Sequence, residues 1–260
     1  MASLEKKLIR DKSFFKVLGL VSLLTFSSSS AIVQKDFNPV NYENKISISN
    51  KNKKEFSKLL KVYKGLDFFQ LNSYLETLSP DSLNLHYNIA LGFFGDGNAS
   101  FFIRGDSAYT SLEVDFNSIV NIFKKDCKTQ FSKKDENYVE NLNGEVHFIT
   151  KDNFPACYND IFSVLKDGIF SGWNKEAFVF VGGKKLYIPI TKEEINEGAV
   201  GLATEDLNFL NIKDILVICY KHNGMEVPVV ASVKYGHKRI KFILDYNNLT
   251  FLEARGESLP

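Results

Sequence analysis

The chain has 260 residues, of which 24% are charged and 44% hydrophobic, and this is the balance of a globular protein that buries a core. Its formal net charge is +1, which excludes the basic excess that nucleic-acid binding or a polybasic membrane contact requires. The 23 phenylalanines and 11 tyrosines favour β-strands and large apolar contacts over a bundle of helices.

The first 31 residues have the order of a secretory signal peptide. Five basic residues precede residue 17, an uncharged run follows from Val17 to Phe26, and Ser27–Ala31 supplies small residues at its exit. The apolar run is about ten residues long, roughly half of what a spanning helix needs, so we expect cleavage after Ala31 and no stable membrane span. Removal of five basic and two acidic residues would leave 260 − 31 = 229 residues with a net charge of +1 − 3 = −2. The sequence therefore predicts a secreted or periplasmic protein.

After this segment the sequence predicts a flexible lead-in and one α+β domain. Residues 32–51 are rich in Asn, Lys and Ser, and residues 52–260 carry the patterns of regular structure. Apolar residues at helical spacing predict one helix over 56–63 and a second over 68–78, which Ser79–Pro80 would end.

The middle of the chain indicates antiparallel strands. Strand patterns over 85–94 and 100–104 flank Gly95–Asn98, which predicts a hairpin turn, and 109–114 predicts a third strand. Asp115 has the chemistry of an N-cap for a helix over 116–123. Residues 124–143 are polar and are expected at the surface, where two subdomains would meet.

The following segment predicts a strand over 145–150 and a helix from Asn153 to about Lys166. A second hairpin is expected from 178–181 and 186–190. Thr191 begins a Thr-x-x-Glu spacing, which is typical of a capping box.

The C-terminal stretch predicts a three-stranded antiparallel meander. Residues 214–220, 225–233 and 240–244 have strand patterns, and Asn223–Gly224 between the first two favours a tight turn. The alternation predicts one packed face and one wet face. Pro228 cannot donate a ladder hydrogen bond, so either the middle strand is bulged there or the strand order is not a simple meander.

The three cysteines carry two alternative interpretations. Cys219 lies in an apolar run and is expected to be a core thiol, whereas Cys127 and Cys157 are candidates for a disulfide in an oxidising compartment. Alternatively, Cys157 in the first turn of a helix is a candidate nucleophile, because a helix N-terminus favours a thiolate. His237, with Asp245 to orient it, is the candidate base, and His147 is the other.

No cofactor or metal is predicted, because the four histidines are scattered without a ligand spacing. Three functions stay open. The first is an exported, non-enzymatic binding or effector-like protein whose aromatic residues form a surface for a protein or small molecule. The second is a cysteine-dependent hydrolase that uses Cys157. The third is a structural envelope or assembly protein that uses exposed strand edges.

Overall fold

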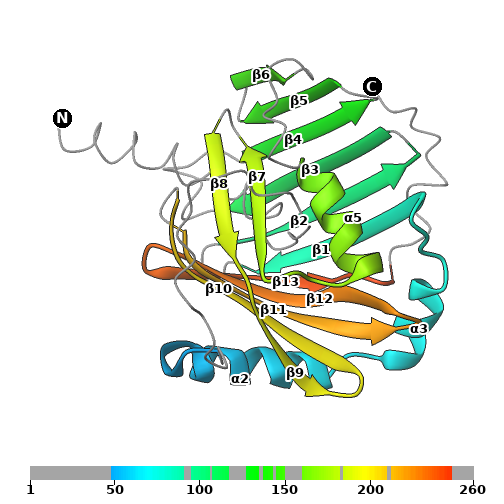
Figure 1. Cartoon of the computed structure of the whole chain (residues 1–260), viewed down its shortest axis with the longest axis vertical. Helices are drawn as coiled ribbons and strands as arrows, with labels where there is room; N and C mark the ends of the chain where they lie inside the picture. Colours follow the sequence, from blue (N-terminus) through cyan, green and yellow to red (C-terminus); the bar gives the residue numbers. More distant parts are fainter. Residues whose placement is uncertain are drawn as a thin grey trace.

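A computed structural model describes residues 48–90, 95–105, 107–116, 127–134, 137–142, 145–149, 160–181, 184–209 and 212–247. The helices in this part of the chain are α2 (Asn50–Lys64), α3 (Phe68–Leu75) and α5 (Ile161–Ser171). The strands, drawn in Figure 1, are β1 (Ser82–Ala90), β2 (Gly95–Arg104), β3 (Ser107–Phe116), β4 (Cys127–Lys134), β5 (Asn137–Leu142), β6 (Glu145–Ile149), β7 (Glu176–Val181), β8 (Lys184–Pro189), β9 (Thr191–Asn196), β10 (Ala199–Phe209), β11 (Ile212–His222), β12 (Met225–Tyr235) and β13 (Lys238–Leu244).

An 11-stranded antiparallel sheet organises the fold, in the order β6-β5-β4-β3-β2-β1-β13-β12-β11-β10-β9. Strand β1 pairs with β13, with Tyr87 opposite Leu244, so the two β-rich sections of the sequence share one sheet. Strands β7 and β8 form a separate hairpin. The predicted α+β class with N-terminal helices is confirmed, and the predicted C-terminal meander is β11-β12-β13.

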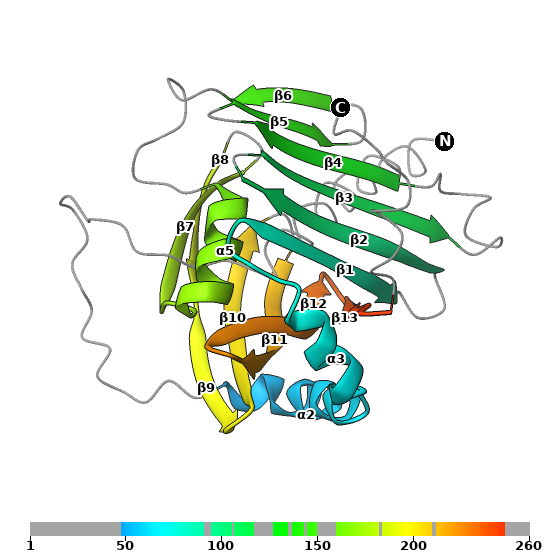
Figure 2. The same ribbon diagram turned by 90° about the vertical axis from the view of Figure 1, so that its right-hand side faces the viewer.

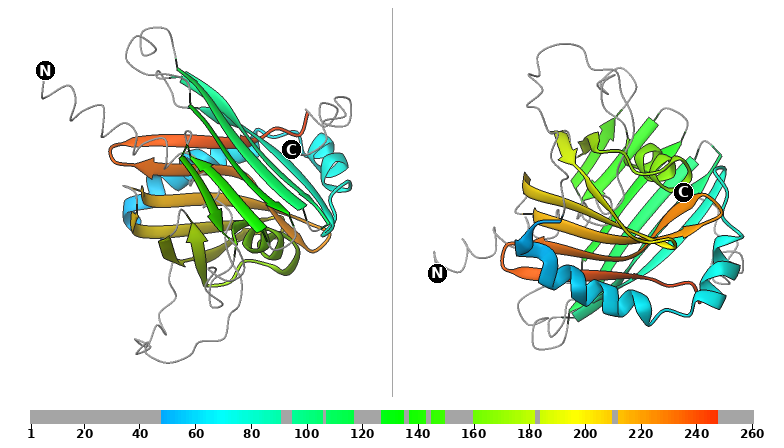
Figure 3. Two further views of the ribbon diagram at one scale, coloured as in Figure 1. Left: turned by 90° about the horizontal axis from the view of Figure 1, so that it is seen from above. Right: turned by 60° about the horizontal axis from the view of Figure 1, so that its bottom comes forward.

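The sheet bends, and the remaining elements pack on its two sides. Helix α5 and the β7–β8 hairpin lie on the inner side of the bend (Figure 2). Helices α2 and α3 lie against the outer side of the C-terminal half, which Figure 3 shows from above and from below. None of the described helices has both the length and the apolar character required to cross a bilayer.

Helix α2 packs on the outer face through Phe56, Leu59 and Tyr63, which are buried, while Leu60, the fourth apolar position of the predicted helix face, is half-buried. Gly201 of β10 lies directly under Phe56, where a Cβ atom would come within 2.4 Å of the ring. The absence of a side chain at this position therefore lets the helix approach the sheet closely.

A buried ion pair adds to the contact between α2 and the sheet. Asp214 of β11 is fully buried, and its Oδ1 lies 2.8 Å from Nη1 of Arg239 in β13. The Nη2 group of Arg239 donates to Oδ1 of Asn52 in α2 at 3.3 Å. This arrangement joins the helix to two strands that are not neighbours.

Strands β11 and β12 are buried on both faces, so the expectation of a wet face was wrong for them. Residues Ile212 and Asp214–Cys219 are all buried, as are Val227–Val233. The reason is that α2 covers the outer face of these strands while α5 packs against β12 from the inner side. Strand β13 keeps the predicted alternation, with Ile240, Phe242 and Leu244 buried.

Pro228 lies at a β-bulge. Ile218 pairs with Val230 but Cys219 pairs with Pro228, so Val229 is the extra residue and the register shifts there. This confirms the bulge alternative, and the meander order is retained.

Three local predictions, for Gly95–Asn98, Asp115 and Thr191, were wrong because strand pairing overrode local signals. Gly95–Asn98 belong to β2 instead of a turn, and Asp115 pairs with Asp96 inside β3 instead of capping a helix. The polar segment 124–143, which was expected at the surface, contains β4, which pairs with β3, and β5, which pairs with β4. Thr191 begins β9, whose charged residues lie on an edge strand, and no capping box forms. The helix predicted over 116–123 lies outside the described residues after Phe116.

Helix α5 overlaps the end of the helix predicted from Asn153 to about Lys166 and continues five residues further, to Ser171. It begins at Ile161, after Asp160, whose carboxylate accepts from the backbone N–H of Ser163 at 2.9 Å. At its other end Gly168 packs against the ring of Trp173, 2.6 Å from where a Cβ atom would lie.

Candidate functional site

The structure describes some of the sequence-predicted site residues. Cys157 lies outside the described residues, so its predicted nucleophilic role and its predicted disulfide stay predictions. His237 is exposed in the turn between β12 and β13, and Asp245 follows β13. The seven residues of β13 lie between these two, which places them about 26 Å apart along extended chain, so the structure does not bring them together. Cys127 begins β4, and His147 lies opposite Glu140 in the middle of β6.

Asp245 lies beside a different histidine. Its backbone N–H donates to the carbonyl of His86 at 2.8 Å, and the ring Nδ1 of His86 lies 3.0 Å from Oγ of Ser100. Burial lowers the pKa of His86, and the negative charge of Asp245 partly opposes this effect. Sequence reasoning missed this cluster of His86, Ser100 and Asp245, because His86 and Ser100 are fourteen residues apart on two strands and are brought together only by the register of the strands.

Helix α3 lies beside the cluster of His86, Ser100 and Asp245. The Tyr74 hydroxyl donates to the carbonyl of Asn84, and burial raises the pKa of Tyr74. The neutral imidazole of His86 and the hydroxyl of Ser100 share a hydrogen bond, and this bond links β1 to β2. The cluster therefore connects α3, β1 and β2.

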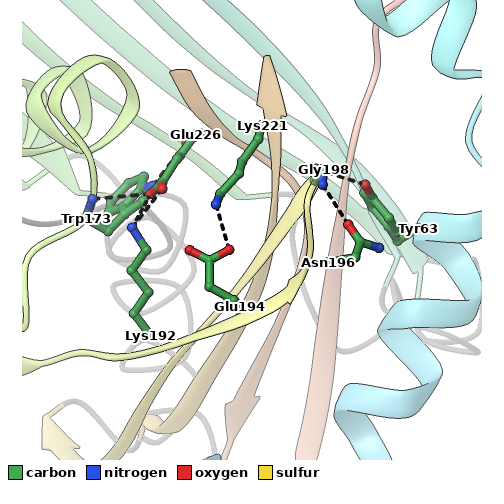
Figure 4. Close-up of polar contacts among 8 residues, drawn as sticks. All are labelled: Tyr63, Trp173, Lys192, Glu194, Asn196, Gly198, Lys221 and Glu226. Atoms are coloured by element: carbon green, nitrogen blue, oxygen red, sulfur yellow. Dashed lines mark hydrogen bonds and ion pairs between the residues drawn. The ribbon is translucent and has the colours of Figure 1, made fainter. Parts of the chain in front are cut away.

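Glu226 is the centre of a second polar cluster, on the inner side of the sheet (Figure 4). Its carboxylate lies 2.7 and 2.9 Å from the Lys192 ammonium, and Trp173 Nε1 donates to its carbonyl at 3.0 Å. The Trp173 backbone N–H also donates to the carboxylate, at 3.5 Å. The cluster joins β9, β12 and the segment after α5, so it fixes the end of α5 against the sheet.

Three further contacts in Figure 4 lie along the same end of the sheet. Lys221 and Glu194 form an ion pair at 2.6 Å. The Tyr63 hydroxyl donates to the carbonyl of Gly198 at 3.3 Å, and the Gly198 N–H donates to Oδ1 of Asn196 at 2.8 Å. Burial, with a smaller effect of Tyr220, raises the pKa of Tyr63 to about 12. The Tyr63 hydrogen bond holds the β9–β10 turn against α2, and the other two contacts join β9 to β11 and close the turn itself.

Cys219 is a fully buried free thiol, as predicted. Burial raises the pKa of Cys219, with Glu226 contributing in the same direction and Lys192 opposing it. A raised pKa keeps the sulfur protonated, which is the chemistry of a core residue and the opposite of an activated nucleophile.

The two edges of the large sheet differ in chemistry. On β9 the exposed side chains are mostly charged, including Lys192, Glu193 and Glu194. On β6 the structure describes two side chains, both apolar and exposed: Val146 is 47% exposed and Phe148 is 72% exposed. Charged edges resist pairing with another chain, whereas apolar edges permit it.

An apolar row continues from β6 across the outer face of the sheet. Phe148 lies opposite Val139, and the same line of paired residues passes through Ser132 to Tyr109 and Phe102. Directly paired residues point to the same face. Val139, Tyr109 and Phe102 are half-buried, so part of each side chain is accessible. We call Val146 and the four apolar members of this row (Phe102, Tyr109, Val139 and Phe148) the β6 patch.

Comparison with known proteins yields only remote structural likeness. No protein-family model and no curated protein sequence matches the chain. LprF from Mycobacterium bovis is similar with a TM-score of 0.28 and 11% identity, over 74% of this chain and 92% of that one. The hypothetical protein CT021 from Chlamydia trachomatis has a TM-score of 0.30 and 9% identity, over 67% of this chain and 89% of that one.

Proposed function

We propose that this chain is an exported, non-enzymatic binding protein that takes up an extended segment of a partner protein along β6. The observation that carries the proposal is the exposure of Val146 and Phe148 on a terminal strand, in contrast to the charged β9 edge. A strand that joins a sheet edge obtains affinity from main-chain hydrogen bonds and specificity from alternate side chains. Val146 and Phe148, two residues apart, are spaced to contact such alternate side chains.

The β6 patch supplies a surface larger than the edge alone. Tyr109 and Phe102 continue the row begun by Phe148 and Val139, and aromatic residues are favoured at protein interfaces. Burying the 72% exposed Phe148 ring would contribute about 1–2 kcal/mol to binding. This corresponds to roughly a tenfold change in affinity.

Site-specific photo-crosslinking tests the proposal. A benzoylphenylalanine at position 148 is compared with one at Phe69, which is 82% exposed on α3 and serves as the matched control. We expect a crosslinked partner protein from position 148 and none of the same mass from position 69. The purified partner should then bind Phe148→Asp at least about tenfold more weakly than wild type, and Phe69→Asp as wild type does. Equal binding by all three proteins would refute the role of β6.

Export is a separate part of the proposal, and it is supported by the signal-like order of residues 1–31. N-terminal sequencing of the protein recovered outside the cytosol should begin at Ile32. A cytosolic protein that retains Met1 would contradict it.

A further inference from the structure

The two β6 side chains that the structure describes occupy positions on either side of the central residue of the strand. Val146 precedes His147 and Phe148 follows it, and both apolar side chains are exposed. We propose that a second copy of this chain occupies the β6 edge, with the two β6 strands pairing antiparallel about a two-fold axis at His147. The proposal rests on the proposed function, because it names an occupant of the same edge.

The register follows from the symmetry. A two-fold axis at His147 places Val146 opposite Phe148 of the second copy, Phe148 opposite its Val146, and Glu145 opposite its Ile149. All five residues of each strand are then paired. The two valine–phenylalanine pairs lie on the outer face, beside the Val139 of each copy. Aromatic and β-branched side chains are favourable cross-strand partners.

The charged side chains of β9 favour β6 over β9 as the edge of the second copy. If β9 docked on β6, the exposed charges of Lys192, Glu193 and Glu194 would lie beside Val146 and Phe148. That contact would place charged side chains, two of which form the ion pairs Lys192–Glu226 and Glu194–Lys221, against apolar side chains that offer them no polar group, and it would also propagate from copy to copy. Pairing of β6 with β6 uses the same surface on both copies and therefore closes as a dimer.

The dimer is expected to be weak and to compete with the partner protein. A five-residue strand makes a small contact, of the size found in transient complexes. Because the dimer covers Val146 and Phe148, only the monomer has the edge free. Partner binding should therefore weaken as the concentration of the protein rises.

Cysteine crosslinking tests the register. Full-length Val146→Cys and Phe148→Cys proteins of different mass are mixed and oxidised, and the disulfides are mapped by mass spectrometry. Directly opposite residues have Cβ atoms about 5 Å apart, which suits a disulfide, whereas two copies of the same position lie diagonally at about 7–8 Å. We expect the 146–148 disulfide to exceed both the 146–146 and the 148–148 product. Wild type and Phe69→Cys are the controls for the native cysteines and for random collision.

Sedimentation equilibrium up to about 1 mM provides the second measurement. We expect wild type to dimerise and Phe148→Asp to stay monomeric. A wild-type monomer at every concentration, or equal yields of the three disulfides, would overturn the inference. If position 148 still crosslinks a partner protein under those results, the proposed function stands without the dimer. A dimer with no crosslinked partner would instead refute the proposed function alone.

Discussion

Replacement of Gly201 by alanine tests the close approach of α2 to the sheet. The added methyl group would lie 2.4 Å from Cζ of Phe56 and 3.1 Å from its Cε2, whereas an ordinary contact is 3.4 Å or longer. Phe56 is nearly buried, so its ring has little free space into which to move. Either the ring or the helix must shift by about 1 Å to accept the methyl group.

Two opposing effects determine the magnitude. Overpacking in a well-packed core costs about 1–3 kcal/mol. The change from glycine to alanine also restricts the unfolded chain, which stabilises the protein by about 0.4–1 kcal/mol. We therefore expect Gly201→Ala to lower the free energy of unfolding by about 1–2 kcal/mol. Combination with Phe56→Leu, which shortens the colliding side chain, should recover most of that loss.

Urea denaturation of the two single variants and the double variant measures this coupling. Gly198→Ala is the matched control, because its added methyl group would meet its nearest neighbours at ordinary distances of 3.6 and 3.8 Å. The control should unfold at the wild-type midpoint or slightly above it. Additive effects of Gly201→Ala and Phe56→Leu, or a control as destabilised as Gly201→Ala, would refute the proposed packing.

Three further predictions follow from the polar clusters. Glu226→Gln should lower the free energy of unfolding by about 1 kcal/mol, because it removes the charge that pairs with the partly exposed Lys192. The fluorescence of Trp173, the single tryptophan, reports the urea transition. An unchanged urea midpoint would contradict the role of the cluster in stability. Because burial lowers the pKa of His86, the unfolded chain takes up a proton there before the folded protein does, so the stability present above about pH 6.5 is lost as the pH falls. His86→Gln should then show a smaller loss of stability between about pH 7.5 and pH 5 than wild type, and parallel curves would exclude the effect. The pKa of Tyr63 should be about 12 instead of its usual value of 10, so the alkaline absorbance titration of Tyr63→Phe should lack a component with a midpoint near pH 12. Loss of a component near pH 10 would instead show that Tyr63 is not buried in solution.

The candidate site shows where prediction from the sequence ended. The sequence indicated that aromatic residues supply a recognition surface, but it did not indicate which ones. Phe102, Tyr109 and Phe148 come from three strands, and they lie in one row only because β2, β3, β4, β5 and β6 pair in register. Likewise, Asp245 was expected to orient His237, but strand pairing places it beside His86.

By itself the sequence determined the features that depend on neighbours along the chain. Helical spacing identified the buried face of α2, and two apolar strand-like runs on either side of the Asn223–Gly224 turn identified the β11–β12 hairpin, because these signals lie within a few residues of each other. Only the tertiary structure decided which strands are neighbours and which edges are exposed. The pairing of β1 with β13 and the burial of β11 and β12 from both sides depend on contacts between distant segments, and no local pattern encodes them. Strands β4 and β5 make the same point, since their polar sequences form strands because β3 provides an edge for β4 and β4 provides one for β5.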